Sequence, residues 1–101
     1  FEMESKAKHL SGLLKVLSNE NRLLILCELI KGPKTVGKLG ETVPAITQPA
    51  LSQHLSLLKA HGILDCTKSG QSVTYFIADH RVEAVMSVLK KHYCQSEEDA
   101  L

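Results

Sequence analysis

Side chains that can hydrogen-bond to DNA bases lie together on one face of residues 47–58, whose sequence is TQPALSQHLSLL. At about 100° per residue, Leu51, Leu55 and Leu58 fall on one stripe of a helix. The opposite face carries Pro49, Ser52, Gln53 and Ser56. Glutamine can pair bidentately with adenine, and serine can donate to or accept from base edges and phosphates. This pattern predicts a helix that reads the major groove of DNA.

This segment, hereafter the reading helix, is predicted to lead into two short strands. Thr47 can cap the helix, and Pro49 is tolerated in the first turn because the amide that proline lacks would have no partner there. After a glycine that ends the helix, residues 63–68 and 72–77 have strand composition. The turn Ser69-Gly70-Gln71 separates the two strands. The ribbon is predicted to be a wing, and the alternative is a polar surface helix beside an incidental hairpin.

Four further helices are predicted from apolar residues at helical spacing: residues 4–17, 20–30, 36–41 and 79–94. The second contains LLILCELI, which is apolar nearly all round and must therefore be central to the core. The order predicts a mainly α fold with a small β-hairpin, which is a winged helix-turn-helix with an additional helix at each end. Because a monomeric winged helix needs neither end helix, the first and last are predicted to pair two subunits about a two-fold axis.

Length and composition predict one small domain over residues 1–101, with 44% hydrophobic residues and a modest core. We interpret residues 1–3 as two extraneous residues followed by the natural start Met3, and residues 95–101 as a frayed acidic tail. No run approaches the roughly 20 apolar residues that a membrane span needs, and no signal peptide precedes the first helix. These features predict a cytoplasmic protein that does not contact a membrane.

The formal net charge of +1 neither supports nor excludes nucleic-acid binding. Residues 1–40 hold seven Lys or Arg against four Asp or Glu, whereas residues 79–101 hold three against five. A weakly basic body is thus combined with an acidic end. Cys27, Cys66 and Cys94 are widely spaced and odd in number, which predicts reduced thiols rather than a secreted disulfide framework.

The motifs of the chain resemble the ArsR/SmtB bacterial repressors between roughly Leu10 and Cys94. LSNENRLLILCEL is similar to the opening of the family's second helix, TQPALSQHLSLLKAHGIL to its recognition helix, and SGQSVTYFI to its wing. The resemblance implies a dimeric repressor that leaves an inverted-repeat operator on double-stranded DNA when an inducer binds or a thiol is modified. Pattern and resemblance together predict nine DNA-contacting residues: Thr47, Gln48, Pro49, Ser52, Gln53, Ser56, Lys68, Ser69 and Gln71.

The metal sites of the family's founding members are incomplete in this sequence. The third helix, where thiolate-rich members carry a Cys-x-Cys pair, reads TVGKLGETV. On the last helix, Asp79 and His92 match the family's zinc ligands, but Arg81 and Gln95 stand in the other two positions, and His80 compensates only in part. We therefore expect neither a metal nor a cofactor, and a metal-responsive repressor with a degenerate zinc site is the alternative.

Cys27 and Cys94 resemble the cysteine pair of the family's thiol- and persulfide-sensing branch, which includes BigR, SqrR and HlyU-like proteins. In that branch the two cysteines of one subunit become linked by a disulfide or a short polysulfide, so a reactive sulfur species or an oxidant would be the inducer. The basic residues 90–92 lie within one turn of Cys94, which makes its thiol the candidate for the first attack. The alternatives are that Cys27 is a small buried hydrophobe and that no sensing site exists. Cys66 is predicted to be incidental.

His54 lies nearer the leucine stripe than the polar face, so we predict a packing or bridging histidine, with a DNA contact as the alternative. An enzyme is not expected, since the sequence contains no Cys-x-x-Cys pair, Gly-rich phosphate loop or nucleophile elbow. A winged helix used only for protein contact is the other rival. A protein–protein interface is expected to present aromatic or aliphatic side chains at the positions where the reading helix carries glutamine and serine.

Overall fold

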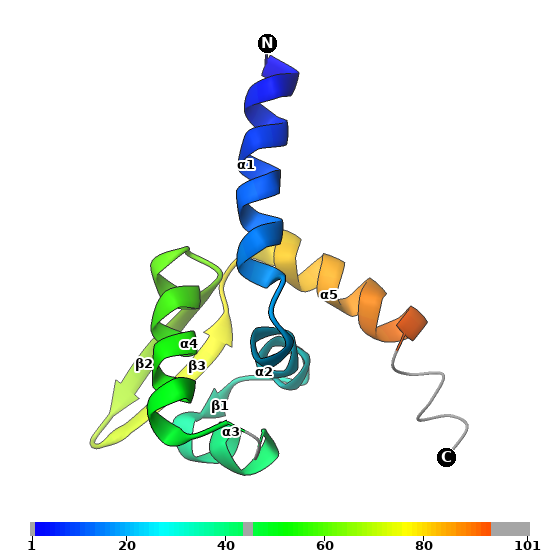
Figure 1. Ribbon diagram of the computed structural model, residues 1–101. Coiled ribbons are helices and arrows are strands. Elements are labelled where there is room, and N and C mark those ends of the chain that lie inside the picture. Colours follow the sequence, from blue (N-terminus) through cyan, green and yellow to red (C-terminus); the bar gives the residue numbers. More distant parts are fainter. Residues whose placement is uncertain (1, 44–45, 94–101) are drawn as a thin grey trace.

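The computed structural model describes residues 2–43 and 46–93 (Figure 1). These residues form five helices and three strands: α1 Glu2–Leu17, α2 Glu20–Ile30, β1 Lys34–Thr35, α3 Val36–Thr42, α4 Gln48–Ala60, β2 Leu64–Ser69, β3 Ser72–Ile77 and α5 His80–Tyr93. The winged helix-turn-helix predicted from the sequence is confirmed. The pair α3 and α4 is the helix-turn-helix, α4 is the reading helix, and β2 with β3 is the wing.

Polar side chains cap the N-terminal ends of α2, α3 and α4. Asn19 Oδ1 accepts two hydrogen bonds from backbone amides in the first turn of α2, at 3.0 and 3.1 Å. Thr35 and Thr47 each accept one from the amide three residues further on, at 3.1 and 3.3 Å. Each bond satisfies an amide that has no intrahelical partner. The predicted start of the reading helix at Thr47 is thereby confirmed.

The sheet has three antiparallel strands in the order β1-β3-β2, where the sequence predicted two. The additional strand β1 pairs Lys34 with Tyr75 and Thr35 with Thr74. Two residues are too few to show the alternation of polar and apolar side chains that marks a strand in sequence. β1 exists because β3 presents an edge to it, so its origin is tertiary pairing rather than local preference.

The wing turn is one residue shorter than predicted. β2 runs to Ser69, which pairs with Ser72, so only Gly70 and Gln71 form the loop. Gly70 has a φ of 62° at the first position of this two-residue loop. Hairpin loops of this length need a positive φ at that position, which glycine adopts without steric cost.

The hydrophobic core lies between α2, α4 and the sheet. Its most completely buried side chains are Ile25, Leu26, Leu39, Leu51, Leu55, Leu58, Ile63, Leu64 and Val82. The set includes the leucine stripe of the reading helix and the apolar centre of α2, both as predicted. The leucines fix one face of α4 against the core and leave its polar face outward.

The reading helix ends in a Schellman motif that ties it to the following elements. Gly62, at a φ of 76°, donates from its amide to Lys59 O at 2.9 Å, and Ile63 donates to Leu58 O at 3.0 Å. Ile63 is fully buried, and its carbonyl accepts from the two amides that precede α5, at 2.9 and 3.4 Å. The C-terminal end of α4 and the N-terminal end of α5 are therefore joined through one residue.

The end helices are only partly covered, and α1 extends away from the rest of the molecule (Figure 1). In α5, Val82 and Met86 are buried, whereas Leu89 and Tyr93 are 40% and 76% exposed. Exposed apolar side chains also lie along α1, namely Met3, Leu10 and Leu14. Within the described residues, each helix is too short or too polar to cross a membrane.

Candidate nucleic-acid interface

The nine residues predicted to contact DNA are all exposed. Six belong to the reading helix and its cap, and three to the wing. Side chains that read base edges must be accessible from solvent, and this face of α4 meets that condition. The contact to DNA itself remains a prediction.

A groove of about 450 Å³ brings the reading helix and the wing together. It is lined by Thr35, Val36, Gly37, Gln48, Gln71, Ser72 and Val73. Gln48 comes from the first turn of α4 and Gln71 from the wing turn, so the two predicted contact regions border the same groove. Figure 1 shows why, since α3 lies beside the N-terminal end of α4 and the wing runs along α4.

α3 packs against the start of the reading helix near Gly40. A Cβ atom at Gly40 would lie 3.7 Å from Gln48 Oε1 and 3.9 Å from Leu51 Cδ2. These are ordinary van der Waals distances for the added atom, so an alanine would fit at this position and would contact the first turn of α4. α3 therefore supports the first turn of α4, where the side chains predicted to read bases begin.

Arg22 connects the reading helix to the two helices that precede it. Its Nε donates to His54 Nδ1 at 3.3 Å, and its Nη1 donates to Val16 O, at the end of α1, at 2.8 Å. Burial, followed by the nearby guanidinium charge, lowers the pKa of His54 below its usual 6.5. His54 is half-buried and acts as the bridging residue that its place beside the leucine stripe predicted. The role of Arg22 was not predicted.

The base of the wing holds a second interaction that the sequence did not reveal. Cys66 on β2 stands opposite Tyr75 on β3. A hydrogen bond with the Cys66 sulfur raises the pKa of Lys59, at the end of α4, and burial followed by Cys66 raises the pKa of Tyr75. Cys66 therefore lies near Lys59 at the end of the reading helix, and the expectation that it plays no part in sensing stays a prediction. The turn between α4 and β2 separates Lys59 from Cys66 along the chain, and no sequence motif predicts that the two are neighbours.

Cys27 faces the last helix. A pocket of about 250 Å³ between α2 and α5 is lined by Leu23, Cys27, Met86, Leu89, Lys90 and Tyr93. Tyr93 ends α5 and directly precedes Cys94 in the sequence. Cys94 lies outside the described residues, as does Gln95, so their predicted roles stay predictions.

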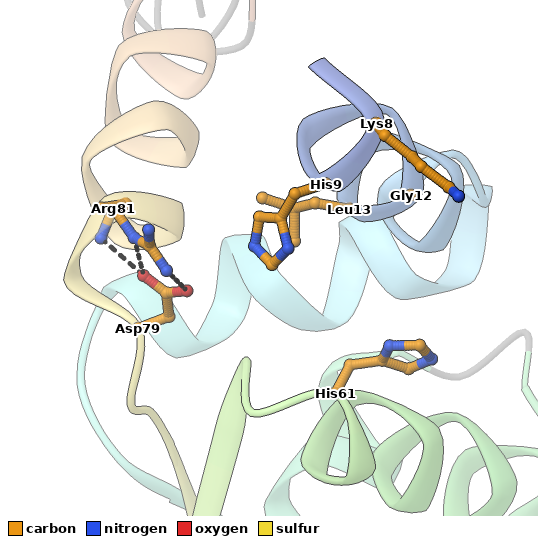
Figure 2. Close-up of a pocket in the computed structure, with 7 residues that line it drawn as sticks. All are labelled: Lys8, His9, Gly12, Leu13, His61, Asp79 and Arg81. Atoms are coloured by element: carbon orange, nitrogen blue, oxygen red, sulfur yellow. Dashed lines mark hydrogen bonds and ion pairs between the residues drawn. The ribbon is translucent and has the colours of Figure 1, made fainter. Parts of the chain in front are cut away.

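The start of α5 borders a pocket of about 320 Å³ that faces α1 and the turn after α4 (Figure 2). Its lining consists of Lys8, His9, Gly12, Leu13, His61, Asp79 and Arg81. Arg81 donates to both carboxylate oxygens of Asp79 at 3.2 Å, and its side chain lowers the pKa of that carboxyl (Figure 2). Asp79, the acid that resembles a zinc ligand, is therefore already paired with Arg81.

The remaining residues do not complete a metal site in one subunit. His92 lies near the other end of α5, roughly 20 Å from Asp79 at 1.5 Å per residue. His80 Nδ1 is 3.8 Å from Glu83 Oε1, away from the Asp79 and Arg81 pair. Among residues 2–43 and 46–93, no three His, Cys, Asp or Glu side chains come together in a way that could hold a metal ion.

Comparison with known proteins places this architecture in a family. The sequence model of the HxlR-like helix-turn-helix family matches residues 16–98. The chain belongs to this family. The relatives that this chain resembles are transcription regulators, and this chain is accordingly a DNA-binding transcriptional regulator.

Individual relatives agree with this family membership. The transcriptional activator HlyU of Vibrio cholerae is 38% identical over 95 residues, which cover 94% of this chain and 87% of HlyU. The biofilm growth-associated repressor of Xylella fastidiosa is 31% identical over 99 residues, which cover 98% of this chain and 86% of that protein. A solved structure of reduced HlyU from Vibrio cholerae matches with a TM-score of 0.86 over 92% of this chain and 97% of that one.

The family model carries the HxlR-like description, whereas the motifs of the sequence resemble ArsR/SmtB repressors. The relatives are consistent with that resemblance, since one of them is HlyU and another is a repressor named SmtB, from Mycobacterium tuberculosis. The predicted resemblance to the HlyU-like branch is confirmed at this level.

Proposed function

We propose that this protein is a homodimeric repressor that leaves an inverted-repeat operator when Cys27 and Cys94 of one subunit become bridged. The observation that carries the proposal is the pocket between α2 and α5, because Cys27 and Tyr93 both line it and Cys94 follows Tyr93 directly. The relatives include both an activator and a repressor. We propose repression because the sequence motifs resemble those of the ArsR/SmtB repressors. A regulator of this kind acts on DNA in the cytoplasm.

The exposed apolar faces of α1 and α5 support the dimer. Val85, Val88 and Leu89 of α5 are 47%, 55% and 40% exposed, and with Ala84 they line one apolar pocket. A domain of this size gains substantially from burying such a face against a second copy. A two-fold axis through these helices would set two reading helices about one DNA turn apart.

The bridging chemistry needs an electron acceptor. With a hydroperoxide, the Cys94 thiolate attacks oxygen and forms a sulfenic acid while the alcohol or water leaves. The Cys27 thiolate then displaces water to form the disulfide, so that two thiols lose two electrons and two protons. With a hydropersulfide, Cys94 takes up the sulfane sulfur and releases a thiol. Attack by Cys27 then closes the disulfide and releases hydrogen sulfide.

The bridge would act on DNA binding through α2 and α5. A disulfide requires the two Cα atoms within roughly 7 Å. In the chain-entropy model, closing a loop of roughly 65 to 70 residues reduces the entropy of the unfolded chain and stabilises the bridged protein by about 4 kcal/mol. A coupling of only about 1 to 3 kcal/mol suffices to change operator affinity 5- to 150-fold. A shift of α5 would reach the reading helix through Ile63, whose backbone hydrogen bonds join the end of α4 to the start of α5.

The test compares operator affinity of reduced, diamide-treated and hydropersulfide-treated protein, with peptide masses at each cysteine. We expect treatment to release DNA from the wild type and from the matched control Cys66→Ser, but not from Cys27→Ser or Cys94→Ser. Micromolar zinc should leave binding unchanged. Release of DNA from both Cys27→Ser and Cys94→Ser on treatment would falsify the thiol mechanism, whereas release by stoichiometric zinc would favour the metal-responsive alternative.

A further inference from the structure

We infer that the pocket between α1, the turn after α4 and the start of α5 binds a small organic anion that carries a carboxylate or a phosphate group (Figure 2). Its volume of about 320 Å³ is large enough for a metabolite of a few carbon atoms. The site is separate from the cysteine pair of the proposed function, because none of its lining residues is a cysteine. A small molecule that binds there would reach the regulator at a second point.

Positive charge outweighs negative charge in the lining of this pocket. Lys8 and Arg81 carry permanent cations, whereas Asp79 is the one acid in the lining. Asp79 is already paired with Arg81, whose Nε and Nη2 donate to the two carboxylate oxygens at 3.2 Å. A guanidinium has five N–H donors, and this bidentate pair leaves Nη1 for a further acceptor. A bound anion can therefore contact the second edge of the Arg81 guanidinium.

Two histidines and one leucine complete the surroundings of a ligand. His9 extends from α1 and His61 from the end of α4 (Figure 2). A neutral imidazole offers one N–H donor, and a protonated imidazole offers two together with a positive charge. Leu13 is half-buried and forms an apolar part of the wall. Donors beside an apolar wall suit a carboxylate or a phosphate on a short carbon chain.

A metal ion fits this pocket less well than an anion. His9, His61 and Asp79 are residue types that ligate metals. Within residues 2–43 and 46–93, however, no three such side chains are grouped so that they could hold a metal ion. The carboxylate of Asp79 is also bonded to Arg81. A metal cation would be repelled by the guanidinium and by Lys8, whereas an anion would be attracted to both.

The face of α1 that lines the pocket differs from the face that we assign to the dimer. At about 100° per residue, the lining residues of α1, which lie between Lys8 and Leu13, centre on one side of the helix. The exposed apolar residues Met3, Leu10 and Leu14 centre on roughly the opposite side. Pairing of two subunits through the apolar side of α1 would therefore leave this lining accessible to a small molecule.

Gly12 allows the pocket to be filled without any change of charge. This glycine lies on α1 and lines the pocket, and a Cβ atom there would meet no atom of another segment within 4 Å. Leucine has a higher helix propensity than glycine, so we expect Gly12→Leu to fold at least as stably as the wild type. Its side chain would extend into the space that we assign to the ligand.

The experiment titrates isotope-labelled protein with succinate and with glycerol phosphate at constant ionic strength, and follows the backbone amide signals by NMR. Succinamide and glycerol are the uncharged control ligands. We expect at least one of the two anions to shift the signals around Gly12, His61 and Arg81 and to saturate, with a Kd of about 1 mM or below, because the charged groups are exposed. The anion that binds more tightly identifies the preferred acidic group. The uncharged ligands should shift none of these signals.

Three variants test whether the shifts come from this pocket. Gly12→Leu fills it, and Arg81→Gln removes its guanidinium, so each should lower the affinity roughly tenfold or more. Lys6→Gln is the matched control, because it removes a cation from an exposed position of α1 outside the lining and should bind as the wild type does. Thermal melting without ligand checks that each variant is folded. Wild-type affinity in both Gly12→Leu and Arg81→Gln, or absence of saturable shifts with either anion, would overturn the inference.

Discussion

Gln53 and Lys68 are expected to contribute differently to the proposed complex. Both are exposed, but Gln53 lies on the polar face of α4, whereas Lys68 lies on a wing strand. Glutamine can distinguish base edges, and lysine interacts with phosphate as a point charge. We therefore predict that Gln53→Ala lowers discrimination between operator and unrelated DNA by about 1 to 3 kcal/mol.

Lys68→Ala provides the contrast. It should weaken binding to all sequences alike and reduce the salt slope by about one, because one phosphate contact is lost. Competition binding with mixed duplexes at several salt concentrations measures both quantities. Equal loss of operator and unrelated DNA in Gln53→Ala would show that this side chain reads no base.

His54 makes stability dependent on pH near its titration range. Its pKa is lowered by burial and by Arg22, the charged group that faces it. The unfolded chain, with a pKa of about 6.5, takes up the proton first as pH falls. The free energy of unfolding should therefore decrease between about pH 6.5 and the lower pKa of the folded state, and level off below it.

The measurement is urea unfolding at several values between about pH 7.5 and about pH 5, in the wild type and in His54→Gln. Glutamine keeps an acceptor for Arg22 but cannot titrate. The difference between the two proteins should be largest on the acidic side of pH 6.5. Parallel curves across the whole range would contradict an electrostatic role for His54.

The Schellman motif at the end of α4 is the element whose backbone depends most on one residue. Gly62 adopts a φ of 76°, and its amide and that of Ile63 close the helix. Alanine at this position costs about 1 to 2 kcal/mol because its Cβ is strained in the left-handed region. We predict this loss for Gly62→Ala in urea unfolding. Gly37→Ala, whose φ is helical, is the control and should lose nothing.

The sequence predicted the position of an element correctly where a local signal existed. The prediction failed where pairing with another strand created the element. The leucine stripe, the Thr47 cap and both wing strands were predictable because period, cap chemistry and strand composition are local properties. β1 was missed because two residues carry no period, and the wing turn was predicted one residue too long because strand register fixes it. The contacts of Arg22 with His54 and of Lys59 with Cys66 join different elements, so no spacing revealed them.

At the scale of the whole molecule, the uncovered apolar faces of α1 and α5 predict a protein that is stable as a pair. Val88 is 55% exposed in the single chain, so a charge there should leave the fold of one subunit intact. In a dimer the same charge would be buried, which is costly without a partner. We predict that Val88→Asp is monomeric and binds the full operator weakly.

Light scattering and operator titration check this prediction. Ser87→Asp is the control, because it places the same charge on an exposed polar position of the same helix. The control should remain dimeric and bind DNA. A dimeric Val88→Asp protein would place the interface elsewhere than this face of α5.

The thirteen residues of α4 carry two sets of side chains that do not overlap. Leu51, Leu55 and Leu58 hold the helix in the core, while Ser52, Gln53 and Ser56 are exposed and support no packing. If the second set reads the operator as we propose, the preferred operator can change by substitution there without loss of the fold. After duplication of such a gene, two copies could diverge toward different promoters and still respond to the same stimulus. The same separation makes this helix a tractable scaffold for retargeting a regulator to a chosen site.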